Sequence, residues 1–368
     1  MEYMAFIGGI HVIVSSYKYN SSNSTIYCNC NKLTKYFSIH KKRTSPSVIT
    51  ACFENKTTVA SPPGLSLRLG ASNLFVGELA VILENNPSAL YHGIDPNIIK
   101  ILREGGVSLL DCSNLSEEAQ NECFDKLKPY NSPVLQSTRI LPPTPSQFER
   151  VLSKTLNSLQ KSLSLSPQTY NNTNQLLYLI DCTTESYKDE LSDVIRAFHE
   201  NSIDAVGCYH CDNIDRLREI HEVLSKENVP LSSNQIPFSV IRGHDKNIQE
   251  IQKVCRELQV SPIAESPLEN GMFLSEKNSF MLTPRPLNTE EYKPLVNLMR
   301  LLGVFQGGRS VEQVALNYVI CSGWIPLAPV NSVFSAQNAV NSMGWKLDSA
   351  SLDALDEKSK YIASKMDS

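Results

Sequence analysis

Cysteines, preceded in two cases by an aspartate, stand at the ends of three short apolar runs. These endings are Asp111-Cys112, Asp181-Cys182 and Cys208-Tyr209-His210-Cys211. The cysteines of the third segment have the Cys-x-x-Cys spacing of a redox dithiol or of half a zinc site. Because side chains alternate along a strand, the cysteine of each Asp-Cys pair is expected to point away from its aspartate, as a small core residue. One hypothesis is therefore a thiol or metal-binding protein that uses Cys208 and Cys211, although no complete metal site is predicted.

Eight short apolar runs alternate with segments of helical period after residue 67, which is typical of a parallel sheet with connecting helices. The runs are residues 79–83, 107–111, 133–138, 176–181, 205–208, 231–234, 261–265 and 325–329. Eight strands are what a closed (β/α)8 (TIM) barrel requires. A doubly wound sheet is the alternative, but no glycine-rich phosphate loop follows the first run. The barrel is therefore the predicted α/β fold.

The elements around these strands also have sequence signals. Residues 67–76 alternate apolar and polar positions on both sides of a Gly/Ser/Asn turn, which predicts a β-hairpin ahead of the first barrel strand. Asp212-Asn213 is the predicted cap of a helix that runs to about Lys226. Since barrel enzymes carry their sites at the carboxyl ends of the strands, the polar endings described above should gather at one face.

The first 51 residues differ in composition from the rest. They hold six Lys or Arg residues and one acid, among many Ser, Thr and Asn. This acid-poor, hydroxyl-rich composition is typical of organellar transit peptides. An untargeted disordered tail is the alternative. We predict a disordered chloroplast transit peptide at residues 1–51, a linker at 52–66 and a barrel domain at 67–368 that resides in the plastid stroma.

The overall composition excludes several classes of function. The formal net charge is −4, and removal of the basic first segment leaves a still more acidic domain, which argues against nucleic-acid binding. No run approaches the ~18 apolar residues of a membrane span. The ten cysteines are scattered through a chain too long to need disulfides, so they are interpreted as thiols in a reducing compartment.

Five strings, in the right order along the chain, resemble aldo/keto reductases, most closely the plastid pyridoxal-reductase-like members of plants. They are residues 69–76, residues 228–239, Ser266-Pro267-Leu268 with Gly271, residues 311–318 and Gly344-Trp345-Lys346-Leu347. Together they span about residues 67–358. The resemblance implies a barrel in which NADPH lies across the carboxyl ends of the strands. There it would give a hydride to a carbonyl that a Tyr acid polarises, with a Lys, an Asp and a His beside it.

The catalytic positions that the resemblance implies hold mostly different residues. Asp111 matches the family aspartate. Ser116, Arg139 and Asp181 stand where the family has its Tyr, Lys and His. A serine hydroxyl is a far weaker acid than a phenol, the planar fork of arginine does not replace an ammonium, and an ionised aspartate only accepts hydrogen bonds. Arg139 beside the two aspartates is interpreted as a buried ion pair that fills the emptied cavity.

The implied cofactor positions are also changed. The retained positions are Gln235, Ser266, Leu268 and Gly271. Tyr209-His210 replaces a Ser-Asn pair that binds the carboxamide, and Glu265 replaces the aromatic residue that stacks on the nicotinamide. Asn331-Ser332 stands where a Lys or Arg binds the 2′-phosphate, so a charge-assisted contact is lost. We expect NADPH binding to be weakened.

These substitutions lead to the main hypothesis, a pseudoenzyme that has lost the catalytic Tyr, Lys and His and acts as a binding or regulatory protein. The resemblance suggests an active reductase as its partner, because some barrels of this family serve as accessory subunits. The alternative within the same fold is an active NADPH-dependent carbonyl reductase, of aldehyde or pyridoxal type, with a rearranged site.

Overall fold

The computed structural model divides the chain into two units, Met1–Ala60 and Ser61–Ser368, and each is described by itself. In the first unit it describes the strands β1 Tyr3–Ile7, β2 Ile10–Val14, β3 Tyr17–Tyr19, β4 Thr25–Cys30 and β5 Leu33–Ser38. In the second it describes residues 67–84, 94–115, 119, 123, 134–138, 174–183, 187–274 and 289–366.

The first unit contains two small antiparallel sheets. β1 pairs with β2, and β3, β4 and β5 form the second sheet in that order. This differs from the sequence-based expectation of a segment without regular structure. Runs such as Ile-His-Val-Ile-Val in β2 are rich in β-branched residues, which favour extended backbone. The assignment of residues 1–51 as a transit peptide stays a prediction.

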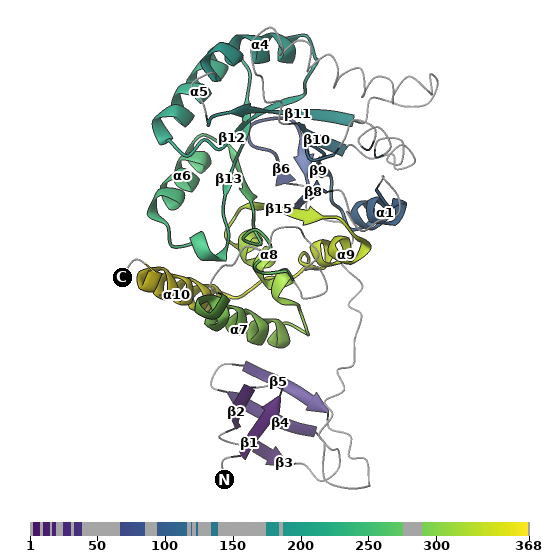
Figure 1. The fold of residues 1–368 in the computed structure, drawn as a ribbon, viewed down its shortest axis with the longest axis vertical. Helices are drawn as coiled ribbons and strands as arrows, with labels where there is room; N and C mark the ends of the chain where they lie inside the picture. The colour runs from purple at the N-terminus through teal and green to yellow at the C-terminus, as the bar shows by residue number, and fades with distance from the viewer. Residues whose placement is uncertain are drawn as a thin grey trace. The chain divides into compact units, whose positions relative to one another are not determined.

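The second unit is built on a closed barrel of eight parallel strands (Figure 1). The strands are β8 Ala80–Leu83, β9 Leu109–Asp111, β10 Val134–Thr138, β11 Asn174–Asp181, β12 Ala205–Tyr209, β13 Leu231–Pro237, β14 Ser261–Glu265 and β15 Ile325–Val330. They pair in chain order, and β15 closes the ring by pairing with β8, where Leu327 lies opposite Ala80. The predicted (β/α)8 barrel is therefore confirmed.

The helices of the barrel are α1 Pro96–Glu104, α4 Tyr187–His199, α5 Ile214–Lys226, α6 Lys246–Glu257, α7 Thr289–Phe305, α8 Val311–Cys321, α9 Val333–Asn341 and α10 Ser349–Met366, with a short 3-10 helix η1 at Val240–Arg242. Side chains cap the first residues of several of them, namely α1, α5, α6, α8 and α9. The predicted cap of α5 is confirmed, since Asn213 accepts a hydrogen bond from the backbone N–H of Arg216. In Figure 1, α4, α5 and α6 follow one another along one side of the barrel.

The predicted hairpin consists of β6 Leu67–Arg68 and β7 Phe75–Val76, and it lies at the amino ends of the barrel strands. Its backbone is tied to the barrel, because the Gly70 N–H donates to Ser261 Oγ at 2.8 Å. Gly70 has φ +55°, and a Cβ there would lie 2.3 Å from the carbonyl oxygen of Ser232. Only glycine fits so close an approach.

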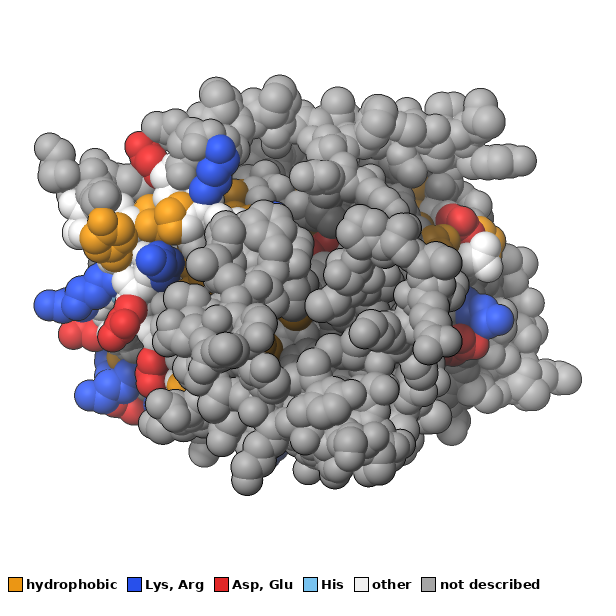
Figure 2. All heavy atoms as spheres, turned by 90° about the horizontal axis from the view of Figure 1, so that it is seen from below, with side chains coloured by type: hydrophobic (Ala, Val, Ile, Leu, Met, Phe, Trp, Pro, Cys, Tyr) orange, Lys and Arg blue, Asp and Glu red, His pale blue; other side chains and the backbone are white. Residues whose placement is uncertain are grey.

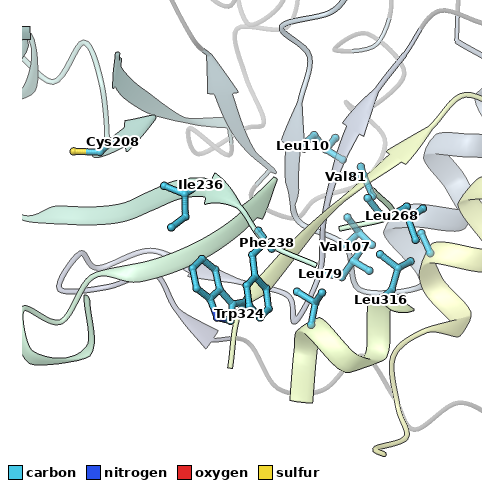
Figure 3. Close-up of a cluster of buried hydrophobic side chains, with 14 of the residues drawn as sticks. Leu79, Val81, Val107, Leu110, Cys208, Ile236, Phe238, Leu268, Leu316 and Trp324 are labelled. Carbon is cyan, nitrogen blue, oxygen red and sulfur yellow. The ribbon is translucent and has the colours of Figure 1, made fainter. Parts of the chain in front are cut away.

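Two buried clusters lie on opposite sides of the barrel wall. Leu109, Leu177 and Tyr209 share the inner cluster with hairpin residues such as Leu69. The outer cluster lies between strands and helices and contains their chain neighbours, including Leu110 and Cys208. Figure 3 shows part of it. Because successive side chains of a strand point to opposite faces, neighbouring residues of one strand belong to different clusters.

The surface visible in Figure 2 is mixed in charge where the structure describes it: Lys and Arg side chains lie interspersed with Asp and Glu side chains near the margin of that view. Among the described helices, none combines the length and the apolar character needed to cross a membrane.

Candidate functional site

Asp111 stands at the carboxyl end of β9 and is 2% exposed. It occupies the same strand face as the inner-cluster residue Leu109, so the alternation directs it toward the barrel interior. Its carboxylate accepts a hydrogen bond from the backbone N–H of Ser113 at 2.9 Å. Ser116 and Arg139, the predicted replacements of the family Tyr and Lys, lie outside the described residues.

Asp181 ends β11 in the same way, two residues after the inner-cluster residue Leu179. It is buried, and one carboxylate oxygen accepts from both the backbone N–H and the hydroxyl of Thr183, at 2.9 and 2.6 Å. In the strand register it lies directly opposite Tyr209 of β12. The polar ends of β11 and β12 therefore meet at one end of the barrel, as the sequence predicted.

Tyr209, His210 and Glu265 form a hydrogen-bonded network at this end. The Tyr209 hydroxyl donates to Glu265 Oε1 at 3.3 Å, and His210 Nε2 contacts Glu265 Oε2. The Tyr209 and His210 rings stack, with centroids 4.1 Å apart and planes inclined by 19°. His210 has a left-handed backbone conformation, at φ +52°. β12 and β14 are separated only by β13, so a long side chain from one reaches the end of the other.

The residues that the resemblance implies as retained cofactor positions lie on β13 and after β14. Gln235 is buried in β13, opposite Tyr209. Its backbone carbonyl accepts a hydrogen bond from the backbone N–H of His210 at 2.7 Å. Ser266 follows β14 with φ +52°, and its hydroxyl donates to Asn270 Oδ1 at 3.2 Å. Further along this loop, Leu268 is buried, and Gly271 has φ +95°.

The start of α9 holds the position implied for the 2′-phosphate. Ser332 caps the helix by accepting from the Ser335 N–H at 3.1 Å. The Ser335 hydroxyl in turn accepts from the N–H groups of Ser332 and Asn331, at 3.0 and 3.1 Å. Three of the backbone N–H groups at this helix start are therefore already satisfied by side chains of the chain itself.

The sequence patterns did not identify two acidic residues near this end of the barrel. Glu84 directly follows β8, and burial raises the pKa of its carboxyl. Glu269 lies in the loop after β14 and accepts hydrogen bonds from Ser239 and Arg242, at 3.2 and 3.4 Å. The alternation of β8, in which Ala80 and Ile82 belong to the inner cluster, could have indicated Glu84.

The cysteines occupy the other side of the barrel wall. Cys112, Cys182 and Cys208 belong to the outer cluster, and the alternation predicted this for Cys112 and Cys182. Three sulfur atoms, those of Cys182, Cys208 and Cys211, lie within 4.8 Å of one another. Hydrogen bonds with Cys182 and Cys208 lower the pKa of the Cys211 thiol. The sequence pointed to Cys208 and Cys211, and the structure adds Cys182 to them.

Chemically, the described residues at the carboxyl ends are mainly acceptors. When ionised, Asp111, Asp181 and Glu265 offer only acceptor oxygens. The phenol of Tyr209 is a donor, but it is directed to Glu265. The inner face of this end is therefore acidic, and the described polar groups are largely turned toward one another.

Comparison with known proteins connects this barrel to one family. The sequence model of the Aldo/keto reductase family matches residues 97–360. Pyridoxal reductase, chloroplastic, from Arabidopsis thaliana is 31% identical over 159 residues, which is 42% of this chain and 43% of that protein. The match thus spans less than half the length of this relative.

Solved structures share the fold at low sequence identity. The glycerol dehydrogenase AKR11B4 from Gluconobacter oxydans has a TM-score of 0.61 at 15% identity, over 80% of this chain and 94% of that one. The aldose reductase from Schistosoma japonicum has a TM-score of 0.58 at 14% identity, over 80% and 92%. The family match covers well over half of the chain, in the order of elements that the barrel shows. The chain belongs to the aldo/keto reductase family.

Proposed function

We propose that this chain is a non-catalytic plastid member of the aldo/keto reductase family that acts as a binding or regulatory protein. One observation carries the proposal. Tyr209 and His210 both bond to Glu265, and the resemblance implies that the three residues replace the family's carboxamide-binding pair and its stacking aromatic residue. A nicotinamide ring placed there would meet a carboxylate instead of a flat apolar face, and that charge would lose solvation.

The proton donors that a carbonyl reduction needs are also replaced. Asp181 stands at the position of the family His, where it accepts from Thr183 and has no proton to give when ionised. Ser116 and Arg139, at the positions of the Tyr and the Lys, are a weak acid and a permanent cation. This residue set supports loss of the hydride-transfer reaction.

The phosphate end of the cofactor site supports the same conclusion. NADPH carries a 2′-phosphate that needs a cation or a set of backbone donors. Asn331 offers no charge, and Ser332 and Ser335 occupy donors at the start of α9. The described residues thus fit neither the nicotinamide nor the 2′-phosphate of NADPH, and we derive no reaction step through that group.

A restoration experiment tests the proposal. The full chain is titrated with NADPH, following nicotinamide fluorescence, beside a variant with Tyr209→Ser, His210→Asn, Glu265→Tyr and Asn331→Arg. We expect no saturation by wild type at about millimolar cofactor and a gain of roughly tenfold or more in the variant, since one charged phosphate contact contributes ~1.5–3 kcal/mol. Asn297→Ser, an exposed position within α7, is the matched control.

The opposite result has a clear meaning. Micromolar NADPH binding by wild type, with consumption of NADPH when an aldehyde or pyridoxal is added, would refute the pseudoenzyme. It would establish the alternative, an active carbonyl reductase with a rearranged site. The similarity to a chloroplastic pyridoxal reductase makes pyridoxal the first aldehyde to assay.

The plastid location and the partner belong to the same proposal. The basic, acid-poor residues 1–51 and the chloroplastic relative support import into plastids. A fusion of these residues to a fluorescent protein should enter plastids, and a fusion that begins at residue 52 should stay outside. An active reductase is the proposed partner, and size-exclusion chromatography of the two together should show a complex larger than either protein.

A further inference from the structure

A cluster of three buried thiols lies outside the region that the proposed function uses. Cys182 directly follows β11, Cys208 lies within β12, and Cys211 follows β12. Each side chain is at most 1% exposed, and the three sulfur atoms lie within 4.8 Å of one another. The cluster is on the outer side of the barrel wall, and Figure 3 shows Cys208 there.

The fold holds the three residues in place from several directions. Parallel pairing sets Ile180 opposite Cys208, so the residue that follows β11 comes beside the end of β12. Asn234 of β13 donates from Nδ2 to the Cys211 carbonyl at 2.9 Å. Arg216 of α5 donates to the Cys182 carbonyl. Backbone contacts on both sides therefore preorganise the thiols, as metal sites require.

We propose that Cys182, Cys208 and Cys211 bind a Zn²⁺ ion. A tetrahedral zinc with Zn–S bonds of about 2.3 Å places its sulfur ligands about 3.8 Å apart, so thiols within 4.8 Å of one another need only small shifts. Thiolate is a ligand that zinc prefers, and three thiolates leave one of its four positions for a solvent molecule.

The charge of the surroundings favours a divalent ion. Three thiolates with Zn²⁺ carry one net negative charge, which must be compensated when it is buried. The guanidinium of Arg216 acts electrostatically on both Cys182 and Cys211 and supplies the opposite sign. A monovalent Cu⁺ would leave a second negative charge, and the exposed Asp212, which also faces Cys211, would add to it.

Binding would tie β11 to the loop between β12 and α5. No bond is oxidised or reduced: each bound thiol releases its proton to solvent as the thiolate coordinates the ion. The inference does not depend on the proposed function, because the thiols and the Tyr209–Glu265 network lie on opposite sides of the barrel wall. Loss of NADPH binding and gain of zinc binding can therefore be measured separately.

The test uses the full chain, reduced, stripped with a chelator and titrated with Zn²⁺ against a colorimetric zinc chelator. We expect one equivalent of tight zinc. Cys182→Ser, Cys208→Ser and Cys211→Ser should each weaken the affinity by at least the roughly 10- to 100-fold that loss of even an outer contact costs. Cys321→Ser, a change on α8 away from the cluster, should leave the affinity unchanged.

A second measurement covers the case in which a serine variant fails to fold. Wild-type protein loaded with Co²⁺ should show thiolate-to-cobalt charge-transfer absorption of the intensity given by three sulfur ligands. Zinc should also raise the melting temperature of wild type and of Cys321→Ser. Cys182→Ser is the most informative variant, because it leaves the Cys-x-x-Cys pair intact.

Three results would overturn the proposal. One is unchanged zinc affinity in Cys182→Ser, which would exclude a three-thiol site. Another is a disulfide between Cys208 and Cys211 that persists in the protein purified without oxidant, which would make the pair a redox dithiol. The third is binding of Cu⁺ without any binding of Zn²⁺, which would refute the charge argument built on Arg216.

Discussion

Glu190 is expected to make the stability of the fold depend on pH. It lies in α4, is 5% exposed, and accepts a hydrogen bond from the Tyr178 hydroxyl through Oε1. Within the described part of the chain its other oxygen, Oε2, has no hydrogen-bond partner. Burial is the main cause that raises the pKa of this carboxyl from 4.5 to about 7, against the lowering effect of the Tyr178 hydrogen bond.

The sign of the effect follows from linkage. Since the folded-state pKa of Glu190 exceeds the unfolded one, the contribution of this group to stability is largest below about pH 4.5, and it is lost as the pH rises through about 7. A change of the pKa from 4.5 to about 7 corresponds to about 3 kcal/mol. Glu190→Gln has no charge to bury. Its free energy of unfolding relative to wild type should therefore rise by up to about 3 kcal/mol over this interval.

The assay is urea unfolding of both proteins at about pH 5 and about pH 8, compared as a difference of differences so that other titrating groups cancel. The matched control is Glu222→Gln. Glu222 is exposed, and its ion pair with Lys226, 2.8 Å long, lowers the pKa of its carboxyl. Its effect should be small and of opposite sign. Parallel pH profiles for wild type and Glu190→Gln would refute the reasoning.

Two further substitutions, each with a matched control, test contacts that stabilise the barrel domain. Gly70→Ala should lower the unfolding free energy by roughly 2–4 kcal/mol, because its Cβ would meet the Ser232 carbonyl at 2.3 Å with φ +55°. Gly307→Ala has φ +87° with no atom within 4 Å of the added Cβ, so only the conformational part, roughly 1–2 kcal/mol, should appear. Asn317→Ala should cost roughly 2–5 kcal/mol, since it leaves the carbonyls of residues 342 and 345 and the N–H of residue 347 without their buried partner. The exposed Asn297→Ala is its control, with a change under about 1 kcal/mol. Equal effects within either pair, measured by urea unfolding, would contradict these accounts.

The strands were predictable because each is a short apolar run between helical segments, and a barrel strand is buried on both faces. The residues at which the strands end were less predictable. β12 was predicted to end at Cys208 and extends to Tyr209, because Tyr209 pairs with both Asp181 and Gln235. β13 extends to Pro237, where register with Glu265 is kept although proline donates no hydrogen bond.

The sequence predicted which side of the strand a site residue faces, but it did not predict which residues contact one another. Alternation correctly placed Cys182 on the opposite side from Asp181, but only the pairing of β11 with β12 brings Cys182 to Cys208. The hydrogen bond between Tyr209 and Glu265 joins residues 56 positions apart, on strands that are not neighbours. Such a contact requires side chains long enough to reach across the strand between them. No local sequence pattern indicates this.

The hairpin that seals the amino end of the barrel also constrains the order of folding. Its bond from Gly70 reaches a serine 191 positions further along the chain, and β8 finds its second neighbour only in the last strand, β15. The part of the domain that is synthesised first is thus among the last to form all its native contacts. Contacts of such long range slow folding and leave early apolar segments exposed. During synthesis from the N-terminus, the apolar side chains of Leu69, Leu74 and Val76 therefore stay exposed to solvent until nearly the whole barrel has been made.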